Sequence, residues 1–331
     1  MDLRVIPDRA LELSVVGSFS RMGVTARRRL FGWEEPADGA LMGKTALVTG
    51  PTSGLGFATA RAFATLGARV VLVGRNERRL AEVRAQLVGL AGADRFPTVL
   101  ADLSSLASVR AAVDRIAATE DRLDVLVDSA GAIYPERTLS ADGIEATLAV
   151  LVVGPFALTA GLLPLLRASG DARVIAVTSG GMYTQAAGLE DLQLERRSYS
   201  GPLAYARAKR IQVALVREWA RRLAGEAISV NAMHPGWADT PGLARSLPGF
   251  HRVMRPLLRT PEEGVDTVVW LATVQPTPSG GGLYLDRRPR PFDRLPGTRL
   301  TLAERRLVWD TIGRLAGAPD PLPPNGGDGS A

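Results

Sequence analysis

The stretch that decides the fold is Thr45–Gly56, which reads TALVTGPTSGLG. Residues 45–49 form a short apolar and β-branched run that is typical of a buried strand, and residues 55–66 follow with a helical pattern. Glycines between them let the backbone turn sharply, and the N-terminus of the helix offers free N–H groups to a phosphate. A plain tight turn is the alternative, but the position between strand and helix favours a dinucleotide site. The residues expected to hold the nucleotide here are Thr49, Gly50, Thr52, Ser53, Gly54, Leu55 and Gly56.

On both sides of this loop, short apolar runs alternate with longer helical patterns. Further strands are expected at 69–73, 97–101, 123–127, 173–178, 228–232 and about 283–285. Helices are expected at 77–90, 104–118, 143–167, 203–223 and 261–273. Repeated strand–helix units predict an α/β fold with a doubly wound parallel sheet, because parallel strands require helical crossovers. We therefore expect a single Rossmann-fold domain over residues 41–290.

The two ends of the chain lie outside this pattern. Residues 1–40 are expected to be an N-terminal appendage, with helical spacing from Ala10 to Phe19 and a basic stretch beside Phe31 and Trp33. The favoured interpretation is a helix that packs on its own domain, and peripheral membrane contact through residues 10–33 is the alternative. Residues 291–331 are expected to be a C-terminal extension with a helix at 301–315. Its Pro- and Gly-rich end predicts disorder after about residue 317.

Composition excludes several kinds of chemistry. The 331 residues contain no cysteine and only two histidines, which rules out disulfides, thiolate catalysis and a Cys- or His-based metal site. The net charge of +6 comes from scattered arginines without a nucleic-acid-binding signature, so we expect no nucleic-acid partner. The first residues lack a secretory signal, and a cytoplasmic location is expected, with membrane association as an alternative.

Residues 146–166 carry no charge and are long enough to span a bilayer. Gly154 and Pro155 interrupt them, and a helix buried between a sheet and a partner subunit would have the same composition. The buried helix is the favoured interpretation.

The second expected strand is followed by Arg75 and Asn76 rather than by an acid. An acid at this position would accept hydrogen bonds from the adenosine ribose hydroxyls, whereas an arginine can bind a 2′-phosphate. The pair therefore favours NADP over NAD. Stacking of Arg75 on adenine, or exposure to solvent, is the alternative.

The chemical constellation centres on Tyr205 and Lys209, which lie four residues apart and therefore share one face of the expected helix. Lys209 is one of only two lysines in an arginine-rich chain. A nearby ammonium and a cationic nicotinamide would favour the phenolate of Tyr205. Ser179 ends the fifth expected strand, where strand ends face the ligand crevice. His234 is interpreted as a structural neighbour of this site.

These motifs resemble the short-chain dehydrogenase/reductase family, which has the Gly50-x-x-x-Gly54-x-Gly56 spacing and the Tyr205-x-x-x-Lys209 pair. The resemblance covers roughly residues 40–290 and implies hydride transfer, with Ser179, Tyr205 and Lys209 as catalytic residues. It assigns the adenine to Asp102 and Leu103. Its remaining cofactor contacts are Tyr205, Lys209, Ser129, Ala130, Gly131, Pro235, Gly236, Trp237 and Thr240. It also implies a homodimer or homotetramer.

Within the family, the stretches at 179–182, 203–210 and 233–242 resemble the member 12 branch, which is related to retinol dehydrogenase-like enzymes. This resemblance implies a lipophilic carbonyl or alcohol substrate. An apolar wall is expected from Met182, Tyr183, Trp237, Leu243 and Phe250, with residues 243–250 as a mobile cover. Ordinary core packing is the alternative.

Two departures from the family pattern weaken the expectation of efficient turnover. Asp128 and Ser129 stand where the family has two asparagines, and Leu151 replaces the asparagine that holds a water for the proton relay to the lysine. They motivate a second hypothesis, a nucleotide-binding regulator or scaffold with weak or no turnover.

Overall fold

The computed structural model describes residues 4–318 and residue 321. Most of the segment expected to be disordered after residue 317 lies outside the described residues. The centre is one eight-stranded sheet in the order β3-β2-β1-β4-β5-β6-β7-β8. The strands are β1 (Thr45–Thr49), β2 (Arg69–Gly74), β3 (Thr98–Leu100), β4 (Val125–Asp128), β5 (Ala172–Val177), β6 (Ile228–Met233), β7 (Leu283–Leu285) and β8 (Arg288–Pro289).

Strands β1 to β7 are parallel, so their carboxyl ends meet at one edge. The strand order reverses between β1 and β4, which is where ligands bind in open sheets of this kind. The predicted doubly wound sheet is confirmed. β8, which pairs antiparallel with β7, was not predicted because it is only two residues long.

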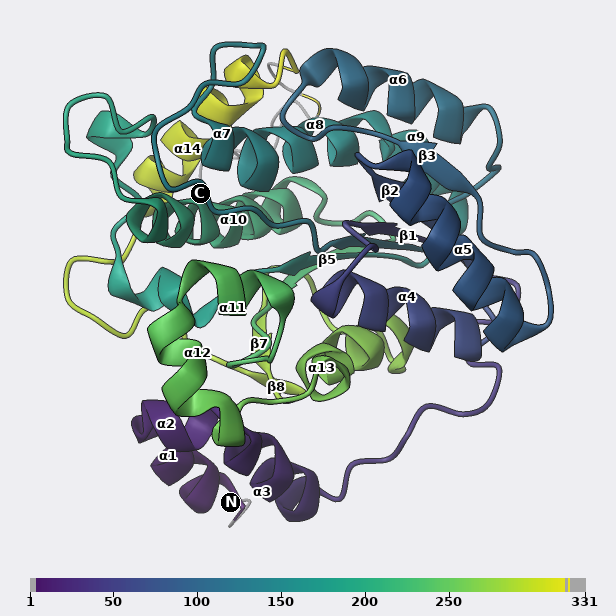
Figure 1. Cartoon of the computed structure of the whole chain (residues 1–331), viewed down its shortest axis with the longest axis horizontal. Helices are drawn as coiled ribbons and strands as arrows, with labels where there is room; N and C mark the ends of the chain where they lie inside the picture. The colour runs from purple at the N-terminus through teal and green to yellow at the C-terminus, as the bar shows by residue number, and fades with distance from the viewer. Residues whose placement is uncertain (1–3, 319–320, 322–331) are drawn as a thin grey trace, which may run out of the picture.

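Helices cover both faces of the sheet (Figure 1). One layer contains α4 (Gly54–Thr65), α5 (Glu77–Ala91) and α13 (Pro261–Thr273), whose apolar sides share a core with β1 and β2. The other contains α6 (Leu106–Ala117), α8 (Gly154–Gly161) and α10 (Gly201–Arg222). α14 (Leu302–Leu315) packs outside this second layer, where the ring of Trp309 contacts those of Phe156 and Trp219.

The long uncharged helix expected at 143–167 is not continuous. It divides into α7 (Ala146–Leu148), a π-helical turn η1 (Ala149–Val153), α8 and α9 (Leu163–Ser169). Pro155 and Pro164 lie in the first turns of α8 and α9, and a proline cannot donate to the carbonyl four residues earlier. In the described residues no single helix is long and apolar enough to cross a membrane, although α7–α8 and α9 together pass that test as a pair bent by 58°. The side chains of the π-helical turn are buried in the core.

The N-terminal appendage is folded against the domain. It forms α1 (Val5–Leu13), α2 (Val15–Phe19) and α3 (Arg21–Phe31), so the helical pattern expected over 10–19 is divided at Ser14. The three helices lie beside α12 (Pro248–Met254) at the foot of the molecule in Figure 1. Arg27 of α3 is fully buried and binds Asp286, which follows β7. This contact ties the appendage to the sheet, as the favoured interpretation expected.

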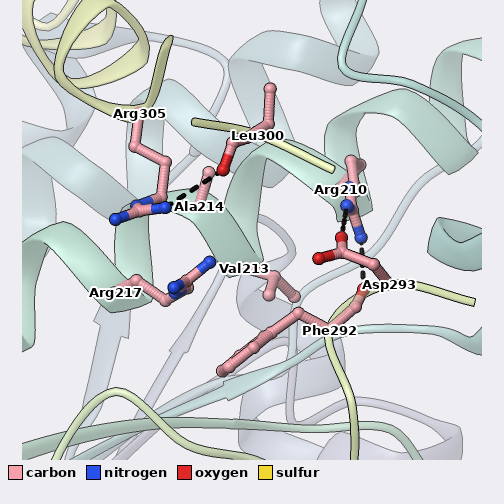
Figure 2. A pocket seen from close by; sticks show the side chains of 8 residues that line it. All are labelled: Arg210, Val213, Ala214, Arg217, Phe292, Asp293, Leu300 and Arg305. Atoms are coloured by element: carbon pink, nitrogen blue, oxygen red, sulfur yellow. Dashed lines mark hydrogen bonds and ion pairs between the residues drawn. The ribbon is translucent and has the colours of Figure 1, made fainter. Parts of the chain in front are cut away.

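The C-terminal extension is held to α10 by side chains that Figure 2 shows converging from both segments. Arg210 binds the Asp293 carboxylate and the Phe292 carbonyl, and Arg305 donates to the Leu300 carbonyl (3.1 Å). The crevice between them has a volume of about 10 Å³, too small for an organic ligand. We interpret this region as a clasp that fixes the extension.

Candidate active site

The glycine loop meets the end of β4 at the point where the strand order reverses. The Thr49 hydroxyl accepts hydrogen bonds from the N–H groups of Ser129 and Ala130 (3.0 Å each). Gly50 has a φ of +67°, and a Cβ built there would lie 2.8 Å from the Ala130 Cα. Both the left-handed backbone and the close approach require glycine. Thus the first and fourth strands bring the two predicted cofactor segments together.

The N-terminus of α4 is suited to a phosphate. Its N-cap residue Ser53 makes no side-chain capping bond, whereas the N-cap residues of α5 and α13 do. The N–H groups of the first turn are therefore not occupied by a cap. Gly54 lies against Thr240, whose side chain would be 3.3 Å from an added Cβ. Thr52 and Leu55 are half-buried at the same loop. These features fit a pyrophosphate, and a nicotinamide cofactor bound there would supply or accept a hydride.

The residues expected at the adenosine end lie along the same sheet edge. Arg75 is exposed beyond β2 and makes no hydrogen bond or ion pair with any residue the structure describes. Asn76 instead caps α5, because its side chain accepts from the Arg79 N–H (3.0 Å). Asp102 accepts from the hydroxyl and N–H of Ser104, and Leu103 is buried. Among these residues, Arg75 is thus the side chain free to meet a phosphate.

The three predicted catalytic residues lie together at the carboxyl end of β5. Tyr205 and Lys209 occupy successive turns of α10, and the Lys209 ammonium is 5.6 Å from the centre of the Tyr205 ring. Ser179 caps the short helix η2 (Gly180–Thr184), where its hydroxyl accepts from the Gly181 N–H (3.2 Å), and it lies near enough to the Tyr205 phenol to lower the pKa of that group. The Thr178 hydroxyl is committed to the Lys209 carbonyl (3.0 Å), which leaves Ser179 as the hydroxyl that can meet a substrate.

The electrostatics of this pair differ from the sequence-based expectation. Burial raises the pKa of Tyr205, and the hydrogen bond from Ser179 only partly offsets it. Burial lowers the pKa of Lys209 to about 7, against the attraction of Asp128. The Lys209 ammonium donates to the Val177 carbonyl (2.7 Å). Without cofactor, therefore, the protein favours the neutral phenol rather than the phenolate.

Asp128 ends β4 inside the domain and is only 7% exposed. Burial raises its pKa to about 7, although the charge of Lys209 opposes the shift. Its Oδ1 atom and the Ser129 hydroxyl have no hydrogen-bond partner among the described residues. The sequence identified both residues as departures from the family pattern, but their burial could not be predicted from it.

The loop after β6 contains the residues expected at the nicotinamide, and the N-terminal appendage holds it. The Trp237 N–H donates to the Phe19 carbonyl (2.8 Å), and Gly236 passes so close that an added Cβ would be 2.5 Å from that oxygen. The Thr240 hydroxyl caps α11 (Pro241–Ser246). Pro235 precedes this turn and packs near Gly264 of α13.

Phe19 is a site residue that the sequence analysis missed. Its ring lies 5.9 Å from that of Trp237 and against Gly180, the residue after Ser179. It therefore touches both loops that flank the catalytic group. The helical spacing over 10–19 placed Phe19 at the end of an expected helix. Nothing local in the sequence indicated its contact with residues more than 160 positions away.

His234 is a structural neighbour, as interpreted from the sequence. It is fully buried, with its ring 4.7 Å from that of Phe19 and 5.8 Å from that of Tyr183. Burial and the nearby Arg259 charge lower its pKa to about 3, so it is neutral at physiological pH.

The expected apolar wall divides in two. Met182 and Tyr183 are buried in the core, and the Tyr183 hydroxyl donates to the Pro291 carbonyl (2.9 Å), so ordinary packing accounts for them. Trp237 and Phe250 form an edge-to-face pair at 5.1 Å, with Leu243 half-buried on α11. Neither α11 nor α12 has a buried residue, which leaves a weakly packed cover over this side.

The described part of the chain contains no group of three or more His, Cys, Asp or Glu side chains placed to hold a metal ion.

Comparison with known proteins agrees with this geometry. Residues 44–248 match the family model described as short chain dehydrogenase. Dehydrogenase/reductase SDR family member 12 of Bos taurus is 40% identical over 280 residues, covering 83% of this chain and 86% of the relative. Retinol dehydrogenase 14 of Mus musculus is 38% identical over 264 residues, covering 74% and 79%.

Among solved structures, L-sorbose reductase from Gluconobacter frateurii, complexed with NADPH and L-sorbose, is similar at a TM-score of 0.62 and 26% identity. The match covers 75% of this chain and 96% of that one.

Proposed function

The chain belongs to the short-chain dehydrogenase family and is an oxidoreductase of the branch that includes member 12 and the retinol dehydrogenases. On that premise we propose that it transfers a hydride between NADP(H) and the carbon of a lipophilic carbonyl or alcohol. The observation that carries the proposal is the meeting of Ser179, Tyr205 and Lys209 at the carboxyl end of β5, beside the glycine loop.

Each of the three residues has a role that follows from its contacts. Tyr205 gives a proton to the carbonyl oxygen in reduction or takes it from the hydroxyl in oxidation. Ser179, which lies beside the phenol, holds the substrate oxygen next to it. Lys209 supplies positive charge next to the tyrosine ring, and it would bind the ribose of a bound cofactor. A bound nicotinamide supplies the hydride.

NADP is proposed as the preferred cofactor because of Arg75. This arginine is exposed just beyond β2 and free of ion pairs with described residues, and the residue that follows it is Asn76 rather than an acid. A free guanidinium can bind a phosphate with two parallel hydrogen bonds. NADPH in the similar L-sorbose reductase supports the same choice.

A lipophilic substrate is supported by the relatives of higher identity and by the apolar side chains near α11 and α12. Retinol dehydrogenase 14, at 38% identity, is named for an apolar alcohol, whereas the sugar reductase is only 26% identical. Trp237, Leu243 and Phe250 present apolar surface on the side of α11 and α12.

The appendage offers a route for such a substrate. Leu13 is 88% exposed, and Val15, Val16 and Met22 are also exposed on the same three helices. Apolar side chains in solvent on helices that also carry an exposed arginine such as Arg9 suit the surface of an anionic membrane. We therefore include peripheral membrane contact through residues 10–33 in the proposal. A homodimer or homotetramer stays a prediction from the family resemblance.

A carbonyl screen tests the proposal. Purified protein is mixed with NADPH and a panel of apolar aldehydes and ketones that includes decanal and retinaldehyde, and NADPH consumption is followed. We expect turnover with at least one of them and a loss of at least a thousandfold in Tyr205→Phe. Cofactor binding with only Tyr205-independent background would instead favour the nucleotide-binding regulator, which Leu151 and Asp128 motivate.

A further inference from the structure

A cavity of about 30 Å³ lies between β4 and β5 on one side and α8 and α10 on the other. Asp128 lines it, whereas Ser179, Tyr205 and Lys209 do not. Most of its lining is apolar, and its polar side chains are Asp128, Thr159 and Gln212. All three are buried. The volume is sufficient for a water molecule, which requires two or more polar partners to stay in such a place.

Two oxygen atoms from residues lining this cavity have no partner in the described structure: Oδ1 of Asp128 and Oε1 of Gln212. The amide oxygen of Gln212 can accept one O–H of a water, and a protonated Asp128 can donate to that water, which leaves its second O–H for a further acceptor. The other end of Gln212 is fixed, because its Nε2 donates to the Leu151 carbonyl (2.7 Å). That carbonyl is available because Pro155, four residues later, has no N–H. Pro155 thus leaves the Leu151 carbonyl free, and Gln212 binds it, so that a polar group lies here without an asparagine side chain.

Lys209 is the charged group that faces Asp128. The helix segments α7 to α9 carry no charge from 146 to 166. Arg173 of β5 lies three residues from the partner of Asp128 and binds the Leu271 carbonyl instead. Lys209, one turn before Gln212 on α10, forms no ion pair with a described residue. Burial raises the pKa of Asp128 to about 7 and lowers that of Lys209 to about 7, so a proton passes readily between them near neutrality.

We propose that Asp128 is the proton-relay residue of this enzyme, acting on Lys209 through a water bound at its free Oδ1, in place of the asparagine that Leu151 replaces. In reduction, the Asp128 carboxyl gives its proton through the water to the neutral Lys209 amine. The resulting ammonium replaces the proton that Tyr205 gave to the carbonyl oxygen, and the Asp128 carboxylate recovers a proton from solvent. In oxidation each transfer runs backwards. The inference rests on the proposed function, since it concerns the same site.

The first test needs no substrate. Infrared spectra of the wild type and of Asp128→Asn, recorded across pH 4–10 in H₂O and D₂O, isolate the C=O stretch of the protonated carboxyl. We expect a band that is absent from the variant and that titrates with a midpoint within about one unit of pH 7. A midpoint below pH 5 would overturn the proposal. This measurement remains decisive if no carbonyl is turned over, a result that contradicts only the proposed function.

The second test uses turnover of NADPH and decanal, or another reactive member of the panel. Asp128→Asn should slow turnover at least tenfold at pH 7 and remove the inflection near pH 7, while NADPH affinity stays within about twofold. Leu151→Asn alone should preserve or raise the rate. In the Asp128→Asn background, Leu151→Asn should restore turnover to within about threefold of the wild type, because the asparagine that holds the relay water in the family is then in place. An Asp128→Asn enzyme with the wild-type rate and pH profile would overturn the relay.

Discussion

Asp286 and Asp128 are both buried carboxyl groups with positively charged neighbours, but the two surroundings differ. Asp286 receives hydrogen bonds from Arg27 (2.7 Å) and from two nitrogens of Arg259 (2.6 and 2.9 Å). Asp128 receives none at Oδ1 and forms no close ion pair with Lys209. Burial alone would raise both pKa values. The arginines reverse that effect at Asp286 and hold its pKa below the ordinary value, whereas Asp128 keeps a pKa of about 7.

The contrast separates a structural use of buried charge from a chemical one. The Asp286 cluster joins segments that are far apart in the chain, because Arg27 also binds Asp8 (2.7 Å) and Arg259 also binds the Phe19 carbonyl (3.0 Å). A fully bonded carboxylate stays ionised and fixes geometry. A carboxyl with a single distant cation can change its protonation state at little cost, which is what a relay requires.

Breaking the paired cluster should have the largest effect. Asp286 has a φ of +55°, which asparagine tolerates, so Asp286→Asn removes the charge without straining the backbone. It removes the carboxylate that pairs with the buried Arg259 and one of the three that pair with Arg27, and we expect a loss of about 3–5 kcal/mol in the free energy of unfolding. Chemical denaturation measures the loss, and faster proteolysis between α3 and β1 would show release of the appendage.

The matched control is Asp114→Asn on the exposed side of α6, which should change stability by less than about 0.5 kcal/mol. If both variants were equally stable, the Asp286 cluster would not be what holds the N-terminal helices on the domain.

Removing the aromatic contact between the N-terminal helices and the Trp237 loop should lower the free energy of unfolding by slightly less. Phe19→Ala empties a buried site between Trp237 and Gly180, and we expect a loss of about 3 kcal/mol. Because the Trp237 loop then loses its backing, KM for the apolar carbonyl should rise more than kcat falls. Denaturation and steady-state kinetics check the two parts. An unchanged KM would limit Phe19 to a packing role.

Asp128→Asn should act in the opposite direction on stability. The unfolded carboxyl loses its proton near pH 3.8 and the folded one near pH 7, so wild-type stability falls as pH rises between these values. The variant avoids this cost, and we expect it to be more stable than the wild type by about 2 kcal/mol at pH 8.5, with no gain at pH 4. Denaturation at both pH values measures the difference. Equal gains at pH 4 and 8.5 would contradict the raised pKa.

The sequence predicted the parts of the molecule that depend on local pattern. The glycine loop, the Tyr205–Lys209 spacing and all seven parallel strands follow from residues within one element or its flanks. The Asp286 cluster could not be predicted, because Asp8, Arg27 and Arg259 meet only through the complete topology. Burial of Asp128 has the same cause. The break at η1 was indicated by Pro155, but a composition that suits a buried helix obscured it.

The smallest expected effect comes from a two-bond Arg–carboxylate pair with bond lengths similar to those at Asp286 and a different environment. Arg167 and Glu226 form two parallel hydrogen bonds of 2.7 and 3.0 Å, close to those between Asp286 and Arg259, but their side chains are 45% and 32% exposed. Solvent already stabilises both charges when they are separated, so Glu226→Gln should cost less than about 1 kcal/mol. High salt should reduce even this loss, while it should leave the loss in Asp286→Asn nearly unchanged. A loss at Glu226 as large as that at Asp286 would mean that bond geometry, rather than burial, sets the strength of these ion pairs.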